Sequence, residues 1–386
     1  MIYKYLPFLL LIMLLSVYVT NKVIKLKITE VKYPEIDGIR GYLAFFVFLH
    51  HSYIWNVYLR TSKWEIPISN LFNHFGQTSV SLFFIITAFL FTTKLLNNKT
   101  QDFDCIKYII SRFHRMFPMY FFSIIFVFII ILFESNFEQK TSVLNILKNV
   151  LSWLFFTVDG ANDINAIKDT FIIDAGVTWT LPYEWLFYFL LPLLALAIKI
   201  KVNLKTIISF SLISLAIAIL NKVSFTYFIP FIGGVLSAIL IYYCNLKLQL
   251  KRNIFSLIGI SLVILSIIFT HRGNKPIPVL ISTLFFIIIA SGNSIFGILS
   301  NMISRKLGQI TYSIYLIHGI VLFVVFRYLL GFKMAAKLTE IEHWGVIALC
   351  IFPIIFISQL TFKHIELPFI NFRKKKLTRF DYIKQN

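Results

Sequence analysis

Residues 35–51 read EIDGIRGYLAFFVFLHH, an apolar stretch with an arginine near its start and a histidine pair at its end. Arg40 and His51 lie eleven residues apart, which is about three helical turns, so both project from one helix face about 16 Å apart along the axis. His50 points roughly 80° away from that line. A charge in hydrocarbon costs about 3 kcal/mol, so such residues usually face a protein interior or a water-filled cavity. The spacing alone allows two interpretations: chemistry inside a bilayer, or an interfacial arginine with a histidine that bonds between helices.

The composition predicts an all-α, polytopic membrane protein. Of 386 residues, 58% are hydrophobic and 14% are charged, and the mean hydropathy is +0.80. A helix needs ~20 residues to cross a hydrocarbon core of ~30 Å. Apolar stretches of suitable length recur along the whole chain, which predicts a bundle of about 10–11 transmembrane helices. They lie near residues 5–21, 38–59, 78–96, 114–134, 181–199, 204–220, 226–243, 254–270, 277–292, 309–331 and 343–363.

The first apolar stretch predicts a retained helix, because no small-residue cleavage site of a signal peptide follows it. We therefore divide the chain into three parts. Residues 1–34 form an extra N-terminal transmembrane helix with a cytoplasmic linker, residues 35–370 form the membrane domain, and residues 371–386 form a basic cytoplasmic tail.

The basic residues follow the positive-inside rule. The net charge is +20, and of 37 Lys and Arg the predicted cytoplasmic stretches hold 24 and the exterior stretches 12, with Arg40 at a helix entrance. The excess holds although the longest loop, residues 135–180, is exterior. This pattern predicts a multi-pass protein of the cell membrane. Binding of nucleic acid would need basic residues clustered with exposed aromatics on a soluble face, and the sequence has no such cluster.

The cysteines and histidines lack the spacing of a metal or disulfide site. Cys105, Cys244 and Cys350 form no CxxC pair, and the eight histidines include no HExxH pattern. The sequence also has no Walker loop, no GxGxxG after a strand and no GxSxG elbow. We expect no metal or bound cofactor, although a metal site assembled from several helices stays open.

Two arginines precede the fourth apolar stretch, at the predicted cytoplasmic boundary. Arg112 and Arg115 are three residues apart and would share a helix face. Planar guanidinium groups bind phosphate through two parallel hydrogen bonds, which a lysine does not provide. Positive charge that anchors the chain at the cytoplasmic face explains the same residues. That role, however, would require neither arginine in place of lysine nor this spacing.

Residues 178–188, TWTLPYEWLFY, open the next helix on the predicted exterior side. Pro182 suits the first helical turn, and Glu184 falls where the helix dipole favours an anion. Glu184 is either a capping carboxylate or a site residue, since it is nearly the only acidic residue within an apolar stretch. Trp179 either anchors the helix at the interface or offers a stacking surface to a sugar.

Two later stretches carry polar side chains. Residues 307–318, LGQITYSIYLIH, bring His318 to about the middle of a spanning helix. There it either bonds to another helix or orients a substrate or a catalytic side chain. Residues 363–368, KHIELP, end the last helix. We expect Pro368 to stop that helix and its charged residues to lie at the interface.

In this order, the stretches resemble the membrane-bound acyltransferase 3 family over about residues 35–370. Members of that family O-acylate surface carbohydrates and related molecules. The family's Arg-x-x-Arg, Trp-Thr-Leu-x-x-Glu-Trp-x-Phe-Tyr and Ser-Ile-Tyr-Leu-x-His patterns fall on residues 112–115, 179–188 and 313–318. Its opening pattern falls on Asp37, Gly38, Arg40, Gly41 and His51.

The chain departs from the family pattern in its second helix. Residues 83–89 read FFIITAF where the family usually has Phe-Phe-x-x-Ser-Gly-Phe. Thr87 keeps a hydroxyl, while Ala88 replaces a glycine that allows close helix contact. Ser81 takes a place that is often acidic, and Pro182 a place that is often serine. These changes bear on the acceptor and the acyl group more than on the class of reaction.

The resemblance implies an integral membrane O-acyltransferase, most simply an O-acetyltransferase, that transfers groups other than aminoacyl groups. The donor would be cytoplasmic acyl-CoA, with acetyl-CoA the simplest case, and the acceptor a hydroxyl of a cell-surface or lipid-linked saccharide. Arg112 and Arg115 would meet the donor phosphates. His51 would act as general base, because an imidazole pKa near 6.5 suits the task, or would carry the acyl group covalently.

The remaining motif residues receive supporting roles from the same resemblance. Asp37 is an ion partner for Arg40. Glu184 and His318 either bind the acceptor or orient His51. Tyr188, in the same pattern as Glu184, and Trp179 are further substrate-binding residues.

A transporter or flippase of a lipid-linked saccharide is the alternative. Its ionisable groups would be spread over many helices along a pathway, whereas this chain concentrates them in four motifs. A structural subunit explains none of the polar spacing. The sequence leaves open the acceptor hydroxyl, the acyl chain length and the oligomeric state.

Overall fold

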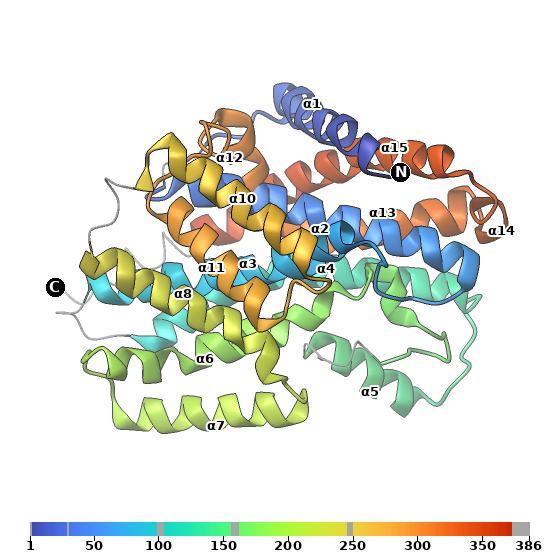
Figure 1. The fold of residues 1–386 in the computed structure, drawn as a ribbon. Coiled ribbons are helices and arrows are strands. Elements are labelled where there is room, and N and C mark those ends of the chain that lie inside the picture. The colour runs from blue at the N-terminus through green and yellow to red at the C-terminus, as the bar shows by residue number, and fades with distance from the viewer. Residues whose placement is uncertain (1, 29–30, 99–103, 156–161, 245–249, 373–386) are drawn as a thin grey trace.

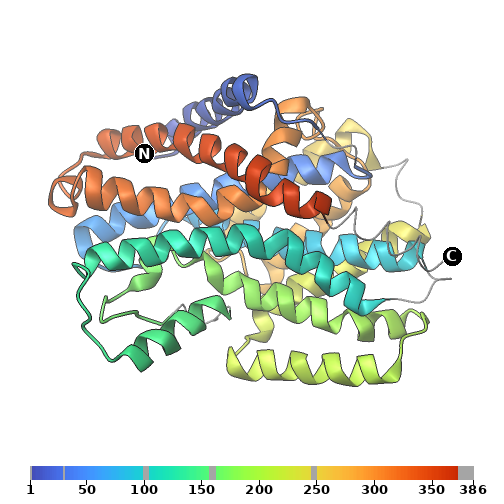
Figure 2. The same cartoon turned by 180° about the vertical axis from the view of Figure 1, so that it is seen from behind.

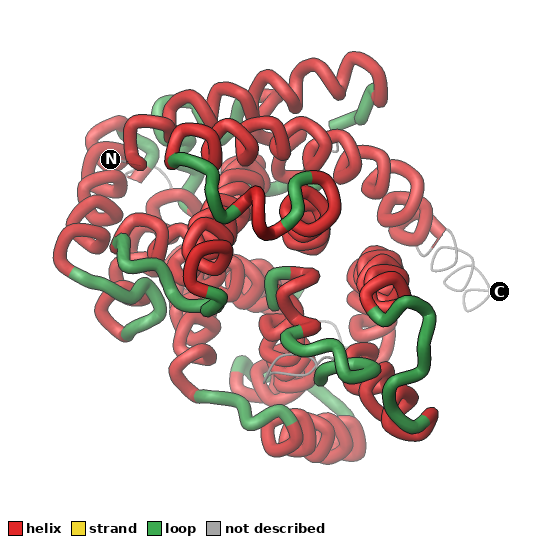
Figure 3. Tube along the Cα trace, turned by 90° about the vertical axis from the view of Figure 1, so that its right-hand side faces the viewer, coloured by secondary structure: helices red, strands yellow, loops and turns green. Residues whose placement is uncertain are grey.

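The computed structural model describes residues 2–28, 31–98, 104–155, 162–244 and 250–372, and these ranges contain helices and no strand (Figure 1, Figure 3). The predicted basic tail lies almost wholly outside them. The α-helices are α1 Leu6–Ile24, α2 Pro34–Thr61, α3 Asn70–Asn97, α4 Cys105–Glu134, α5 Val143–Leu154, α6 Leu181–Ala197, α7 Leu204–Leu220, α8 Phe225–Cys244, α10 Asn253–Phe269, α11 Pro276–Ala290, α12 Met302–Gln309, α13 Thr311–Val324, α14 Phe332–Ala335 and α15 Glu340–Thr361. Short 3₁₀ turns are η1 Ile2–Tyr5, η2 Thr170–Asp174 and η3 Val177–Thr180, and π turns are η4 Val325–Leu329 and η5 Phe362–Glu366.

The structure confirms a polytopic helical membrane protein. Within the described residues, seven helices are long and apolar enough to cross a bilayer. Every stretch expected from hydropathy coincides with a helix. The four outside those seven are α2, whose 28 residues include several charged and polar side chains, and the shorter helices α7, α10 and α11. At 1.5 Å per residue, a helix of ~17 residues spans about 26 Å, a little less than the hydrocarbon core.

The long helices run back and forth between two ends of the bundle (Figure 1, Figure 2). We call the end at which α1 ends, α2 begins and α12 leads into α13 the basic end. The opposite end, the loop end, holds residues 62–69, 135–155, 162–180 and 330–339. Helix α5 lies within this loop region, where the sequence predicted no helix.

Helix α2 is central, because it packs against α3, α12 and α13. Gly38 of α2 and Gly308 of α12 allow α2 to cross α12 and the turn before it. A Cβ atom on Gly38 would lie 1.9 Å from the carbonyl oxygen of Leu299, and one on Gly308 would lie 1.9 Å from that of Asp37. Any larger residue would therefore overlap the neighbouring backbone. A Cβ on Gly41 would lie 2.7 Å from the Leu307 carbonyl carbon, so close packing explains both glycines that flank Arg40.

The end of α15 differs from the prediction in two ways. The helical backbone continues through η5 and Pro368 to Phe372 instead of stopping at the proline. A proline within a helix removes one backbone donor, and here the wider π turn of η5 comes just before it. Glu366, expected at the interface, is only 3% exposed. The interpretation of this stretch as purely interfacial was wrong.

Candidate functional site

Two histidines meet where α2 packs against α13. Nδ1 of His51 lies 2.9 Å from Nε2 of His318, and the rings stack with centroids 5.1 Å apart. His318 is 0% exposed, while His51 is partly exposed. The pair therefore combines a buried histidine with one that an incoming group can reach.

The partners of His318 define the proton arrangement of this pair. Nδ1 of His318 lies 3.0 Å from the carbonyl oxygen of Ile314. A carbonyl only accepts, so Nδ1 carries the proton, and Nε2 of the neutral ring is an acceptor. Nδ1 of His51 then donates to it. With Nδ1 of His51 donating, we assign its free lone pair to Nε2. Nε2 of His51 is therefore the atom that can accept a proton.

His50 has a different environment from its neighbour. Its Nδ1 lies 2.7 Å from the carbonyl oxygen of Phe72 on α3, to which it donates. A Cβ atom on Gly76 would lie 2.6 Å from the His50 ring, so the ring fills the space that this glycine leaves. His50 is buried and links α2 to α3.

Aromatic rings surround His51 toward the loop end. The Trp64 ring stacks on His51 with centroids 6.3 Å apart and an angle of 21° between planes. Trp64 also packs edge to face against Trp55 and Phe171. This apolar wall limits how a substrate approaches the ring.

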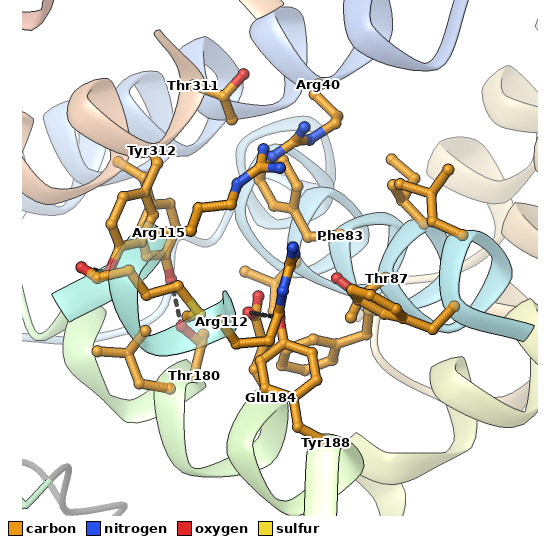
Figure 4. Close-up of a pocket in the computed structure, with 18 residues that line it drawn as sticks. Arg40, Phe83, Thr87, Arg112, Arg115, Thr180, Glu184, Tyr188, Thr311 and Tyr312 are labelled. Carbon is orange, nitrogen blue, oxygen red and sulfur yellow. Dashed lines mark hydrogen bonds between the residues drawn. The ribbon is translucent and has the colours of Figure 1, made fainter. Parts of the chain in front are cut away.

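A cavity of about 120 Å³ lies deeper in the bundle, among α2, α3, α4, α6 and α13 (Figure 4). We call it the inner cavity. A water molecule occupies ~30 Å³ in the liquid, so the space suits a narrow chain or a few waters. The cavity brings together predicted residues from three separate motifs. Those that line it are Arg40, Arg112, Arg115, Glu184 and Tyr188.

Four charged side chains lie among the mostly apolar and aromatic walls of the inner cavity: Arg40, Arg112, Arg115 and Glu184. Arg40 lies 3.8 Å from Asp37, so the ion pair predicted from their spacing is present. The guanidinium of Arg112 lies over the Phe91 ring, 4.9 Å from its centroid. Glu184 accepts a hydrogen bond of 3.0 Å from Tyr188. In Figure 4 the guanidinium groups of Arg40 and Arg115 turn toward the same space.

A second cavity of about 760 Å³ adjoins the inner cavity at the basic end. We call it the vestibule. The two share three lining residues, Leu90, Arg40 and Arg115. The shared residues form a neck between the wide space and the narrow one.

Tyr315 connects the inner cavity to the histidine pair, which does not line that cavity. Its ring lies 6.2 Å from His318 and forms part of the cavity wall. Its hydroxyl bonds to Thr180 at 3.1 Å and to the carbonyl oxygen of Val177 at 3.2 Å. The sequence placed Tyr315 in a motif without giving it a role.

Trp179 lies apart from both cavities. Its ring packs on Tyr227 and Tyr183, with centroids 4.8 and 5.8 Å away. It is partly buried, so an anchoring role and a stacking role both fit this position.

Sequence reasoning missed two buried carboxylates near the site. Glu366 accepts a hydrogen bond from Ser313, which in turn accepts one of 3.0 Å from Thr361. The only signal was an acidic residue beside an apolar stretch. This network joins the start of the 313–318 motif to the end of α15.

Asp174 is the second missed carboxylate and belongs to η2, outside the spanning helices. It is 2% exposed; Oδ1 accepts from the Gly176 amide at 2.9 Å, and Oδ2 has no hydrogen-bond partner among the described residues. Burial raises the pKa of Asp174 to about 7. A Cβ on Gly319 would lie 2.3 Å from its carbonyl carbon. Asp174 therefore packs against α13 one residue beyond His318.

Comparison with known proteins gives one family and one relative. Residues 33–362 match the family described as "Acyltransferase domain". A Staphylococcus aureus (strain MRSA252) protein named "Putative O-acetyltransferase SAR0937" is 22% identical over an aligned length of 389 residues, gaps included. The alignment covers 91% of this chain and 60% of that protein. The chain thus spans 60% of the length of this relative. No solved structure matches.

Proposed function

The chain belongs to the membrane-bound acyltransferase 3 family, and from this premise we propose that it is an O-acetyltransferase of the cell membrane. It takes the acyl group from acyl-CoA, most simply acetyl-CoA, and transfers it to a hydroxyl of a cell-surface or lipid-linked saccharide. The supporting observation is the order of features along α2. The vestibule, the inner cavity and the His51–His318 pair follow one another from the basic end, with Tyr315 between the inner cavity and the pair.

This order suits entry of the donor and the acceptor from opposite ends of the bundle. The excess of Lys and Arg supports a cytoplasmic location for the basic end, on the side where acyl-CoA is made. The donor enters by the vestibule and passes its thioester arm through the neck at Arg40 and Arg115. The acceptor arrives from the loop end, past the aromatic wall at Trp64, and reaches the partly exposed His51.

In the proposed reaction, Nε2 of His51 removes the proton from the acceptor hydroxyl as its oxygen attacks the thioester carbonyl. The new ester C–O bond forms and the C–S bond breaks. The CoA thiolate leaves and takes the proton from the His51 imidazolium. His318 accepts from Nδ1 of His51 throughout, so it fixes the ring and its tautomer.

A covalent route uses the same atom. Nε2 of His51 would first attack the thioester carbonyl and release the CoA thiolate. The acceptor oxygen would then take the acyl group from Nε2, and its proton would go to the thiolate. Incubation of the protein with labelled acetyl-CoA and no acceptor, followed by rapid quenching, separates the routes. Label bound to the protein at His51 supports the covalent route, and label only in the donor supports the general base.

The arrangement favours a donor role for two residues: Glu184, expected to bind the acceptor or to orient His51, and Tyr188, expected to bind a substrate. Glu184 and Tyr188 line the inner cavity with Arg112 and Arg115, so we propose that they contact the donor arm. Trp179 stays a proposal for the acceptor side.

Proteoliposomes test the proposal with donor and acceptor on opposite faces. With radiolabelled acetyl-CoA outside and envelope saccharide inside, protein molecules whose basic end faces outward should acetylate the enclosed saccharide. Transfer only when both substrates share a compartment would refute opposite entry. Movement of saccharide across the membrane without any acetylation would favour the transporter.

A further inference from the structure

The vestibule has a charge far from balance. Among the described residues that line it, six are basic and Asp37 is the acidic one. The basic residues are Lys25, Lys27, Lys32, Arg40, Arg115 and Lys363. Concave walls of one sign focus the electrostatic field and raise the local concentration of oppositely charged ligands. The vestibule is therefore suited to a polyanion.

All four of these lysines come from outside the matched domain. Lys25, Lys27 and Lys32 belong to the segment between α1 and α2, and Lys363 to η5, whereas the family match covers residues 33–362. The arginines at the neck, in contrast, lie within the match. The outer part of the vestibule thus comes from N-terminal and C-terminal segments that flank the family match.

Specific contacts hold this segment against the domain. Helix α1 packs along α15. The Lys363 ammonium donates to the carbonyl oxygen of Ile24 at 2.9 Å, and the Gln309 amide donates to that of Lys27 at 3.1 Å. Because these bonds use backbone oxygens, the side chains of Lys25 and Lys27 are left to line the vestibule. Both are exposed.

The two cavities differ in size as the two ends of acyl-CoA do. The vestibule, at about 760 Å³, is several times larger than the inner cavity of about 120 Å³. A nucleotide with its phosphates is bulky and strongly anionic, while the thioester arm is narrow and uncharged. Lysine ammonium groups act as point charges on flexible stems and suit phosphates presented in several orientations.

We propose that the vestibule binds the nucleotide phosphates of acyl-CoA, and that Lys25 and Lys27 make this chain discriminate acyl-CoA from acyl donors without a nucleotide. The inference rests on the proposed donor. The same lysines would also attract the phosphate of an anionic lipid headgroup, so the test separates these sources.

The test compares two donors, acetyl-CoA and S-acetylpantetheine, which carry the same thioester arm. The double variant Lys25→Gln/Lys27→Gln should raise KM for acetyl-CoA about tenfold or more, which corresponds to about 1.4 kcal/mol. KM for S-acetylpantetheine should not change. Lys25→Arg/Lys27→Arg, which keeps the charge, should restore most of the affinity for acetyl-CoA. The matched control Lys201→Gln/Lys205→Gln, at the same end but outside the vestibule, should leave both values unaltered.

Three results would overturn the assignment. KM rising equally for both donors would mean that the lysines support the fold, and size-exclusion profiles of the variants would show it. An effect present in nanodiscs with anionic phosphatidylglycerol and absent in pure phosphatidylcholine would assign the lysines to lipid. No effect on either donor would mean that the phosphates bind elsewhere.

Binding of CoA itself separates this inference from the proposed function. Calorimetry with CoA on the wild type and the double variant reports on the vestibule without any transfer. If CoA binds and the lysines matter but no acetyl group moves, the phosphate site stands and the proposed activity fails. If CoA does not bind to the wild type, the phosphate site fails.

Discussion

Removal of His318 should slow transfer without weakening donor binding. In the ground state His318 accepts one neutral hydrogen bond of 2.9 Å from His51. When His51 takes the acceptor proton it becomes an imidazolium, and this bond becomes charge-assisted. Hydrogen bonds to charged groups contribute about 1.5–3 kcal/mol, so His318→Leu should lower kcat about 10- to 150-fold. KM for acetyl-CoA should stay within about twofold, because the ring lines neither cavity.

Steady-state rates of acetyl transfer in nanodiscs measure this effect. His318→Gln places an amide oxygen near the position of Nε2 and should recover part of the rate. His343→Gln is the matched control, because His343 is equally buried and its Nε2 lies 3.0 Å from the Ser52 carbonyl oxygen on α2. Wild-type kcat in His318→Leu, or a loss confined to KM, would refute the positioning role.

Three further predictions concern the missed carboxylates and the helix crossing. Burial raises the pKa of Asp174 from 3.8 to about 7, so between these values the folded chain holds a proton that the unfolded chain releases. The contribution of this protonated carboxyl to the free energy of unfolding is full below pH ~4. It is lost as the pH rises to ~7, by up to about 4 kcal/mol. Asp174→Asn should therefore flatten thermal stability between pH 5 and 8 in detergent, and an unchanged pH slope would contradict this assignment. Gly308→Ala should destabilise the protein by about 1–3 kcal/mol or prevent folding, because its Cβ would overlap the Asp37 carbonyl; a wild-type unfolding temperature would show that the crossing is loose. Glu366→Leu should lower the unfolding temperature more than Glu366→Gln, which keeps an acceptor for Ser313; equal effects would exclude that bond.

Hydropathy alone predicted the helical membrane fold, because each spanning helix consists of its own continuous run of apolar residues. Helix α5 was not predicted, since a 12-residue helix within a polar loop region gives a weak signal. Its exposed apolar residues, including Leu144, Leu147 and Leu151, follow helical spacing.

The candidate site was only partly accessible to sequence reasoning. The arginine spacing indicated a shared face, and Arg40, Arg112 and Arg115 do line one cavity. The bond between His51 and His318 joins residues 267 positions apart. The sequence around either residue gives no signal of such a contact. For the same reason the burial of Glu366 was missed, because its partner lies on another helix.

The rate of acetyl transfer by His51→Ala tests the central claim most directly. Purified wild type and variant, in nanodiscs with radiolabelled acetyl-CoA and an envelope saccharide, would be compared at saturating donor. We predict that wild type labels the saccharide and that the variant is slower by about 10²- to 10⁴-fold, with CoA affinity unchanged. Transfer by His51→Ala at the wild-type rate would contradict the account.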